Sequence, residues 1–247
     1  MQSSIPETPT TGTAMTPKAK LEHDEFFYFH GVVFQAENKL FKVPRYGLPA
    51  EDGVFAAMFA LPTAGDREAE GSSDENPIVL PAEVSAHDFR SLLKASYPPC
   101  RAAPNTKGMD VEEWMSVLKL ANMWCLDELR LKAIDASEWL IASKTAQEKI
   151  LLGKRYHVAR WLIDGYVALG QRKEMISDGE REELGIETYV GLVTLRERSW
   201  EWAGDRYGAA GQMREGYDFR GQVIQIFGKE LEQVREFSYP PSPEPAI

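Results

Sequence analysis

The sequence has 247 residues, of which 43% are hydrophobic and 27% are charged, and this balance is typical of a globular protein with a sizeable core. Acidic residues outnumber basic residues by 38 to 28, and the net charge of −10 argues against a nucleic-acid-binding surface, which needs clustered Lys and Arg. No stretch approaches the ~20 apolar residues of a membrane-spanning helix, and the N-terminal segment lacks the apolar run of a signal peptide. We therefore expect a cytoplasmic or nuclear protein, with free thiols at Cys100 and Cys125 and no membrane or nucleic-acid partner.

The first predicted elements are strands that follow a polar lead. Residues 1–22 are rich in Thr, Pro, Ser and Ala and are predicted to be disordered. Two apolar runs at 32–34 and 40–43 are parted by Glu37-Asn38-Lys39, which predicts an antiparallel hairpin. We expect Asn38 to form the turn, because Asn tolerates a positive φ.

A compact apolar helix is predicted after the hairpin. Asp52 is expected to be its N-cap, and Val54, Phe55, Met58 and Phe59 form a wide apolar face. So short a helix is not stable alone and needs a packing partner. Core packing is the preferred role of these side chains, and a ligand-binding aromatic box is the alternative.

An acidic segment separates this helix from the next elements. Residues 62–77 lack apolar periodicity and predict a solvated loop, with a contact loop for a partner as the alternative. A strand is predicted at 78–80. A helix is predicted over 84–97, with Ser85 as its N-cap and Asp88 three positions later.

The second half of the chain is predicted to be almost entirely helical. Asp110 is expected to cap a helix that breaks near 125–127, and the following helix should carry an apolar face made of Leu131, Ile134, Trp139, Leu140 and Ile141. Further helices are predicted in segments that begin at Thr145 and Ser177 and in segments 190–202 and 223–234, with Arg196, Glu197 and Arg198 facing outward.

No motif in the sequence indicates catalysis or metal binding. The four histidines are His23, His30, His87 and His157. None has a second ligand at metal-binding spacing, so we predict no catalytic residue, no cofactor and no metal site. Trp200 and Trp202 are assigned to core packing, with an exposed interface anchor as the alternative.

Several segments together resemble a BTB/POZ domain. They are LFKVPR at 40–45, VFAAMF at 54–59, IVL at 78–80, DFR at 88–90 and WMSVLKLANMWCLDELR at 114–130, the last resembling the closing helix pair of that domain. The pattern as a whole, which covers roughly residues 24–236, is most similar to fungal BTB-domain proteins with a helical C-terminal extension.

This resemblance implies an α+β fold in which a small mixed sheet is clamped by helices and followed by an all-α extension. The implied organisation is a disordered lead at 1–22, a BTB/POZ-like domain at 23–135, a helical extension at 136–237 and a disordered tail at 238–247. The implied core residues are Val33, Leu40, Phe41, Val43, Phe55, Phe59, Phe89, Leu93 and Leu118.

The resemblance also implies a function. BTB/POZ domains are non-enzymatic protein–protein interaction modules, so we expect an adaptor or scaffold that acts by burying surface. A cullin-dependent ubiquitin-ligase substrate adaptor is the alternative, with a cullin as partner, and an unrecognised enzyme is a remote alternative. The chain departs from the family at Pro44 and Asp52, where His and Ser are usual, and its polar lead replaces the long helix of many dimeric members. Homo-oligomer formation is therefore left open.

Overall fold

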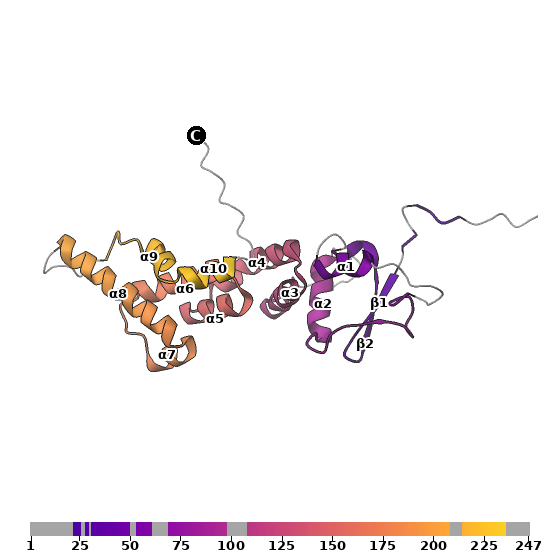
Figure 1. Ribbon diagram of the computed structural model, residues 1–247, viewed down its shortest axis with the longest axis horizontal. Helices are drawn as coiled ribbons and strands as arrows, with labels where there is room; N and C mark the ends of the chain where they lie inside the picture. The colour runs from indigo at the N-terminus through magenta and orange to yellow at the C-terminus, as the bar shows by residue number, and fades with distance from the viewer. Residues whose placement is uncertain are drawn as a thin grey trace, which may run out of the picture.

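The computed structural model describes residues 22–25, 28–29, 31–49, 53–60, 69–97, 108–207 and 214–235. Over these residues the chain is mixed α and β, with a three-stranded sheet and ten α-helices. The sheet lies at one end of an elongated molecule, and α8 reaches the opposite end (Figure 1). The predicted α+β class is confirmed at this level.

The predicted hairpin is present. Strand β1 (Gly31–Ala36) pairs antiparallel with β2 (Lys39–Pro44), with Ala36 opposite Lys39. Asn38 lies in the two-residue turn as predicted, but the positive φ of this turn, 54°, belongs to Glu37. The carboxylate of Glu37 accepts a hydrogen bond from the N–H of Ala86 at 3.2 Å, which ties the turn to the start of α2.

One face of the sheet packs on the core, and the opposite face is exposed at Leu40 and Val79 but buried at Val33. Strand β3 (Ile78–Val79) pairs parallel with β1, which gives the order β2-β1-β3. Side chains alternate between faces along a strand. Phe34 therefore faces the core, whereas the next row, made of Leu40, Gln35 and Val79, faces outward. The prediction of a buried Leu40 is wrong for this reason, and its side chain is 47% exposed.

Helix α1 (Gly53–Ala60) packs one aromatic ring into the core. The ring of Phe55 is buried and meets Phe34 edge-on, with 6.1 Å between the ring centroids. Val54 is exposed, so the wide apolar face is narrower than predicted. Asp52, the expected N-cap, lies outside the described residues.

The second half of the acidic segment is an ordered turn. Residues 61–68 lie outside the described residues, but from 69 onward the chain is hydrogen-bonded to the sheet. The N–H of Val33 donates to the carbonyl of Gly71 at 2.9 Å, and the N–H of Gly71 donates to Asn76 at 2.7 Å. Gly71 has a φ of 83°, which favours glycine, and a Cβ there would meet Val32 and Ile78 at 2.9 Å. This part is therefore a loop, as predicted, with mostly exposed side chains, but its backbone is tied to the sheet.

Three helices complete the first core: α2 (Ala86–Ser96), α3 (Val111–Trp124) and α4 (Asp127–Ala142). The predicted caps are confirmed, because Ser85 accepts from the N–H of Asp88 and Asp110 forms a capping box with Glu113. The predicted break is also confirmed, at Cys125, which adopts a left-handed conformation and carries a free, exposed thiol. Cys100 lies outside the described residues.

The remaining helices are α5 (Ala146–Tyr156), α6 (Ala159–Gln171), α7 (Asp178–Leu184), α8 (Ile186–Tyr207), α9 (Phe219–Ile226) and α10 (Gly228–Arg235). The capping boxes at Thr145 and Ser177 are confirmed. The single helix predicted at 223–234 is instead two helices, which meet at Phe227 and Gly228. Leu131 and Trp139 are exposed on α4, contrary to the prediction, because only the opposite side of this helix packs on the core.

The buried apolar side chains form two clusters that adjoin along α5 and α6. The first cluster holds the sheet and α1–α4, including Ile141 near the end of α4, and it also takes in Tyr156, Val158 and Trp161. The second cluster holds the rest of α5 and α6 with parts of α7–α10. The predicted domain boundary at 135/136 falls inside α4, and the first cluster extends beyond it.

Candidate interaction surfaces

The core residues implied by the family resemblance form a framework and do not converge on a pocket. Four are fully or almost fully buried, namely Val33, Phe55, Phe89 and Leu118, and Leu93 is also buried. Phe41, Val43 and Phe59 are partly buried and pack against the first cluster. Leu40 is the exception described above. Surfaces that could bind a partner therefore lie among the exposed side chains.

Exposed aromatic rings gather beside the end of β2. The short 3₁₀ turn Arg45–Gly47 turns the side chain of Tyr46 outward, where it is 67% exposed. Its ring centroid lies 4.9 Å from that of Phe29, which is 55% exposed. We call this pair, together with the exposed neighbour Tyr28, the aromatic cluster.

The turn that carries Tyr46 is held by its neighbours. The hydroxyl of Tyr97 donates to the carbonyl of Pro44, and burial beside Tyr46 raises the pKa of Tyr97 to about 12. A Cβ at Gly47 would lie only 1.9 Å from the Tyr97 ring, so only glycine fits. The guanidinium of Arg45 stacks over the ring of Phe59 at 4.1 Å. The turn that presents Tyr46 is therefore fixed by these contacts.

An open groove lies where the two buried clusters adjoin. Its volume is about 670 Å³, and its walls come from the start of α2, from α3 and from α5 with the turn before it. Helices α3 and α5 both contribute apolar side chains to the groove, among them Met115 of α3 and Leu152 of α5. The carboxylate of Asp88 on the α2 side is buried and accepts from Lys119 at 2.7 Å. Hydrogen bonds from Lys119, Ser116 and Ser85 outweigh the effect of burial and lower the pKa of Asp88.

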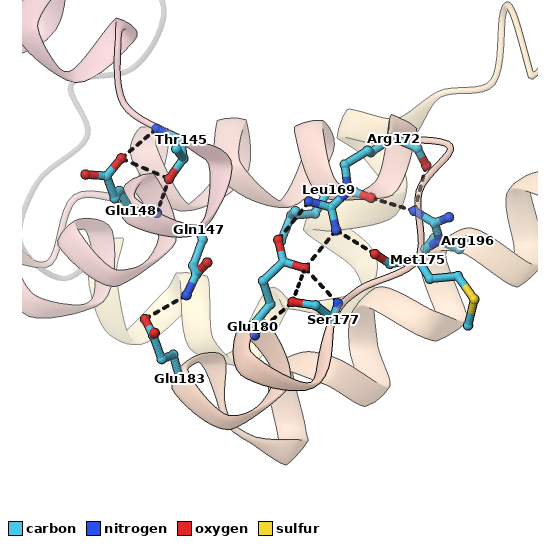
Figure 2. A network of polar contacts seen from close by, with 10 residues as sticks. All are labelled: Thr145, Gln147, Glu148, Leu169, Arg172, Met175, Ser177, Glu180, Glu183 and Arg196. Carbon is cyan, nitrogen blue, oxygen red and sulfur yellow. Dashed lines mark hydrogen bonds and ion pairs between the residues drawn. The ribbon is translucent and has the colours of Figure 1, made fainter.

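A network of arginine and glutamate side chains fixes the link between α6 and α7 (Figure 2). Arg172 donates two hydrogen bonds to Glu180, at 2.7 and 2.8 Å, and a third to the carbonyl of Met175 at 2.9 Å. The N–H of Ser177 also donates to Glu180 at 2.8 Å. The bonds from Arg172, and then those from Ser177, lower the pKa of Glu180 to about 2.

Arg196 belongs to the same network, and its predicted outward orientation is wrong. Its guanidinium donates to the carbonyls of Leu169 and Arg172 at 3.0 and 2.6 Å, near the end of α6 (Figure 2). Carbonyl groups at a helix C-terminus lack helical partners and attract cations. The periodicity of α8 could not indicate this contact, because the acceptors lie on another helix. The network is structural, and it leaves the Met175 side chain 85% exposed.

A second polar cluster holds α10 against the helices beneath it. The buried hydroxyl of Tyr166 donates to Glu230 at 2.7 Å, and Lys154 forms an ion pair with the same carboxylate at 3.3 Å. Lys154 also donates to the hydroxyl of Thr188 at 2.6 Å. Each of these groups has a partner within the chain, so the cluster is explained by helix packing.

Trp200 and Trp202 lie near the far end of the molecule on α8. Trp200 is exposed and the guanidinium of Arg214 stacks over it at 4.4 Å, so the assignment of this residue to the core is wrong. Trp202 is partly buried and meets the ring of Tyr217 edge-on at 5.7 Å. Arg214 also donates to the carbonyls of Gly170 and Gln171, which keeps its charge at the end of α6.

No protein-family model, curated protein or solved structure matches this chain. The BTB/POZ resemblance therefore rests on the sequence motifs. Within the described ranges, no group of three or more His, Cys, Asp and Glu side chains is placed to hold a metal ion. No helix among these residues is long and apolar enough to cross a membrane.

Proposed function

We propose that this chain is a non-enzymatic protein–protein interaction module of the BTB/POZ type, which acts as an adaptor or scaffold by burying part of its surface against another protein. The order of the elements supports this proposal. A β-hairpin, a short aromatic-bearing helix, a third strand and the α3–α4 pair follow one another as the resemblance implies. An all-helical segment from α5 onward follows them, in the place of the helical extension.

The aromatic cluster is the observation that carries the proposal. Tyr46 and Phe29 expose more than half of their surface and lie in contact, although aromatic rings gain most from burial. Aromatic side chains, Tyr above all, are enriched at protein interfaces, where their burial contributes much of the binding energy. A fixed turn that presents Tyr46 beside the exposed ring of Phe29 therefore suits docking of a partner.

Affinity purification of the tagged full-length chain, followed by mass spectrometry, tests the proposal. We expect the combined variant Phe29→Ser and Tyr46→Ser to lose partners that the natural chain retains, because it removes the exposed rings without touching the buried core. Met175→Ser is the matched control, since Met175 is 85% exposed but lies on the α6–α7 link. The same partners in equal amounts from all three proteins would contradict the proposal.

The cullin-adaptor alternative is tested in the same experiment with a chain that lacks residues 62–77. In BTB members that recruit a cullin, the equivalent region lies near the cullin contact. A cullin that is recovered with the natural chain and lost with this deletion would support the alternative. Recovery of other proteins without a cullin would leave the scaffold role. The deleted chain must be checked by circular dichroism, because Gly71 is hydrogen-bonded to β1.

A further inference from the structure

The groove between α3 and α5 has an apolar floor. Met115 and Tyr156 are buried there, and Val111, Leu151 and Leu152 are partly exposed beside them. The floor joins side chains of the first buried cluster with Leu151, which packs on the second. Because these residues come from two helices that are held by a common core, the floor is a fixed apolar strip rather than the side of a single helix.

The rim of the groove carries opposite charges on its two walls. The pairs Asp88–Lys119 and Lys144–Glu148 are each joined by an ion pair, at 2.7 and 3.2 Å. Two exposed charges remain, Glu112 on α3 and Arg155 on α5. Among the described residues neither forms an ion pair with the other or with a third side chain. A ligand in the groove would therefore meet a carboxylate on one wall and a guanidinium on the other.

The shape of the groove favours a protein segment over a small molecule. Pockets for small ligands bury most of the ligand surface, whereas this groove is open to solvent along one side. Helices and extended segments of a partner bind in such open grooves by placing an apolar side chain on the floor. Charges of the partner that lie opposite the rim then set its orientation and its specificity.

We infer that the groove binds an amphipathic segment of a partner protein, with an apolar side chain on the floor, an acidic side chain against Arg155 and a basic side chain against Glu112. This inference rests on the proposed function and adds the chemistry of the partner. The groove lining contains no residue of the aromatic cluster, so the groove is a separate contact.

A random 12-residue peptide library displayed on phage, selected on the full-length chain, tests the inference. We expect enriched peptides to share an apolar residue flanked by one acidic and one basic residue. The synthesised peptide should bind Arg155→Glu at least roughly tenfold more weakly than the natural chain, because attraction becomes repulsion at a partly desolvated site. Reversal of the acidic residue of the peptide to Lys should restore binding to Arg155→Glu. Glu112→Lys should show the same behaviour with the basic residue of the peptide.

Two variants control for the change in charge. Lys149→Glu makes the same reversal on α5 but does not line the groove, and Glu128→Lys matches Glu112→Lys in the first turn of another helix. Both should bind the peptide within about twofold of the natural chain, because screening weakens distant charges. Thermal melting verifies that each variant is folded.

Two results would overturn the inference. One is a selection without enriched peptides, and the other is peptides that bind equally well to Arg155→Glu and to Lys149→Glu. The second result would leave the protein-binding function intact and place it elsewhere on the surface. The proposed function itself fails only if the affinity purification recovers the same proteins from the natural chain and the aromatic-cluster variant.

Discussion

At the scale of single residues, the most constrained polar groups of this chain act on helix ends. The carboxylate of Glu180 accepts from the N–H of Ser177 at the start of α7. Arg196 donates to the carbonyl of Leu169 near the end of α6, and Arg130 donates to the carbonyl of His157 just after α5. These backbone groups have no partner within their own helix. Side chains that bind such groups raise the stability of a helical protein because buried N–H and C=O groups without partners are costly. Two predictions follow from their contacts.

Glu180→Gln is expected to lower the free energy of unfolding by about 1–3 kcal/mol at neutral pH, because charge-assisted hydrogen bonds from Arg172 and Ser177 are lost. The pKa of Glu180 falls from its ordinary 4.5 to about 2 in the folded chain. Its contribution is therefore present above about pH 4.5 and is lost as the pH falls toward 2. Urea unfolding at pH 7 and pH 3 should show a smaller difference between variant and natural chain at the lower pH. Glu182→Gln, on the same helix, is the control and should change little at either pH.

Arg130→Ala is expected to destabilise the chain by about 2–5 kcal/mol, because it leaves polar groups without a partner and removes a buried side chain. Arg130 is almost fully buried and donates to Asn122 at 2.8 Å and to the carbonyl of His157 at 2.6 Å. It thus joins α4 to the end of α5. Burial lowers its pKa, although Asp127 opposes this shift. Arg220→Ala removes an exposed ion pair and should cost less than about 1 kcal/mol in the same chemical denaturation. Equal losses in the two variants would contradict the role of Arg130.

At the scale of elements, the features that the sequence predicts well are those with local causes. The caps at Ser85, Asp110 and Ser177 require only an oxygen and an N–H two or three residues apart, so sequence spacing identifies them. Leu40 and Val54 were misassigned because the face that an element buries depends on what packs against it.

The groove and the aromatic cluster are harder to predict from the sequence than the helix caps. The groove brings α3 beside α5, which follows only after the whole of α4, and no local pattern encodes that approach. The aromatic cluster had one weak signal, the segment Arg45-Tyr46-Gly47 between two prolines, where a turn can present a side chain. Its neighbour Phe29 lies before the hairpin, so the pairing of the two rings appears only in the folded chain.

Substitutions in α1 should differ in their effect on stability, because its side chains differ in burial. Phe55→Ala is expected to lower the free energy of unfolding by about 3–5 kcal/mol, because a buried ring in contact with Phe34 and Trp124 is removed. Phe59→Ala should cost less, since this ring is only partly buried and its Arg45 contact is near the surface. Val54→Ala is the control and should change stability by less than about 0.5 kcal/mol. Denaturant unfolding monitored by circular dichroism measures all three. An unchanged midpoint for Phe55→Ala would contradict its place in the core.

At the scale of the whole molecule, the two buried clusters are joined by shared helices. Within α5, Tyr156 and Leu152 pack in the first cluster, whereas Ile150 packs in the second. Within α6, Trp161 belongs to the first and its neighbour Leu162 to the second. A helix that serves two cores couples their stability, because unfolding of either core exposes apolar surface of the other. The part that carries the sheet and the helices from α5 onward are therefore not independent in packing.

This coupling predicts the behaviour of a fragment that ends at the boundary inferred from the sequence. A chain of residues 23–135 ends inside α4 and lacks Ile141, Tyr156, Val158 and Trp161, which fill the first cluster. Removal of a single large buried side chain lowers the free energy of unfolding by about 2–5 kcal/mol. The loss of four therefore approaches or exceeds the stability of a typical domain, which is ~5–15 kcal/mol. We expect this fragment to show no cooperative thermal transition, whereas residues 23–235 should melt in one transition. Circular dichroism and calorimetry compare the two. A sharp transition of the short fragment would show that the first cluster is complete without α5 and α6, and that the boundary lies within α4 after all.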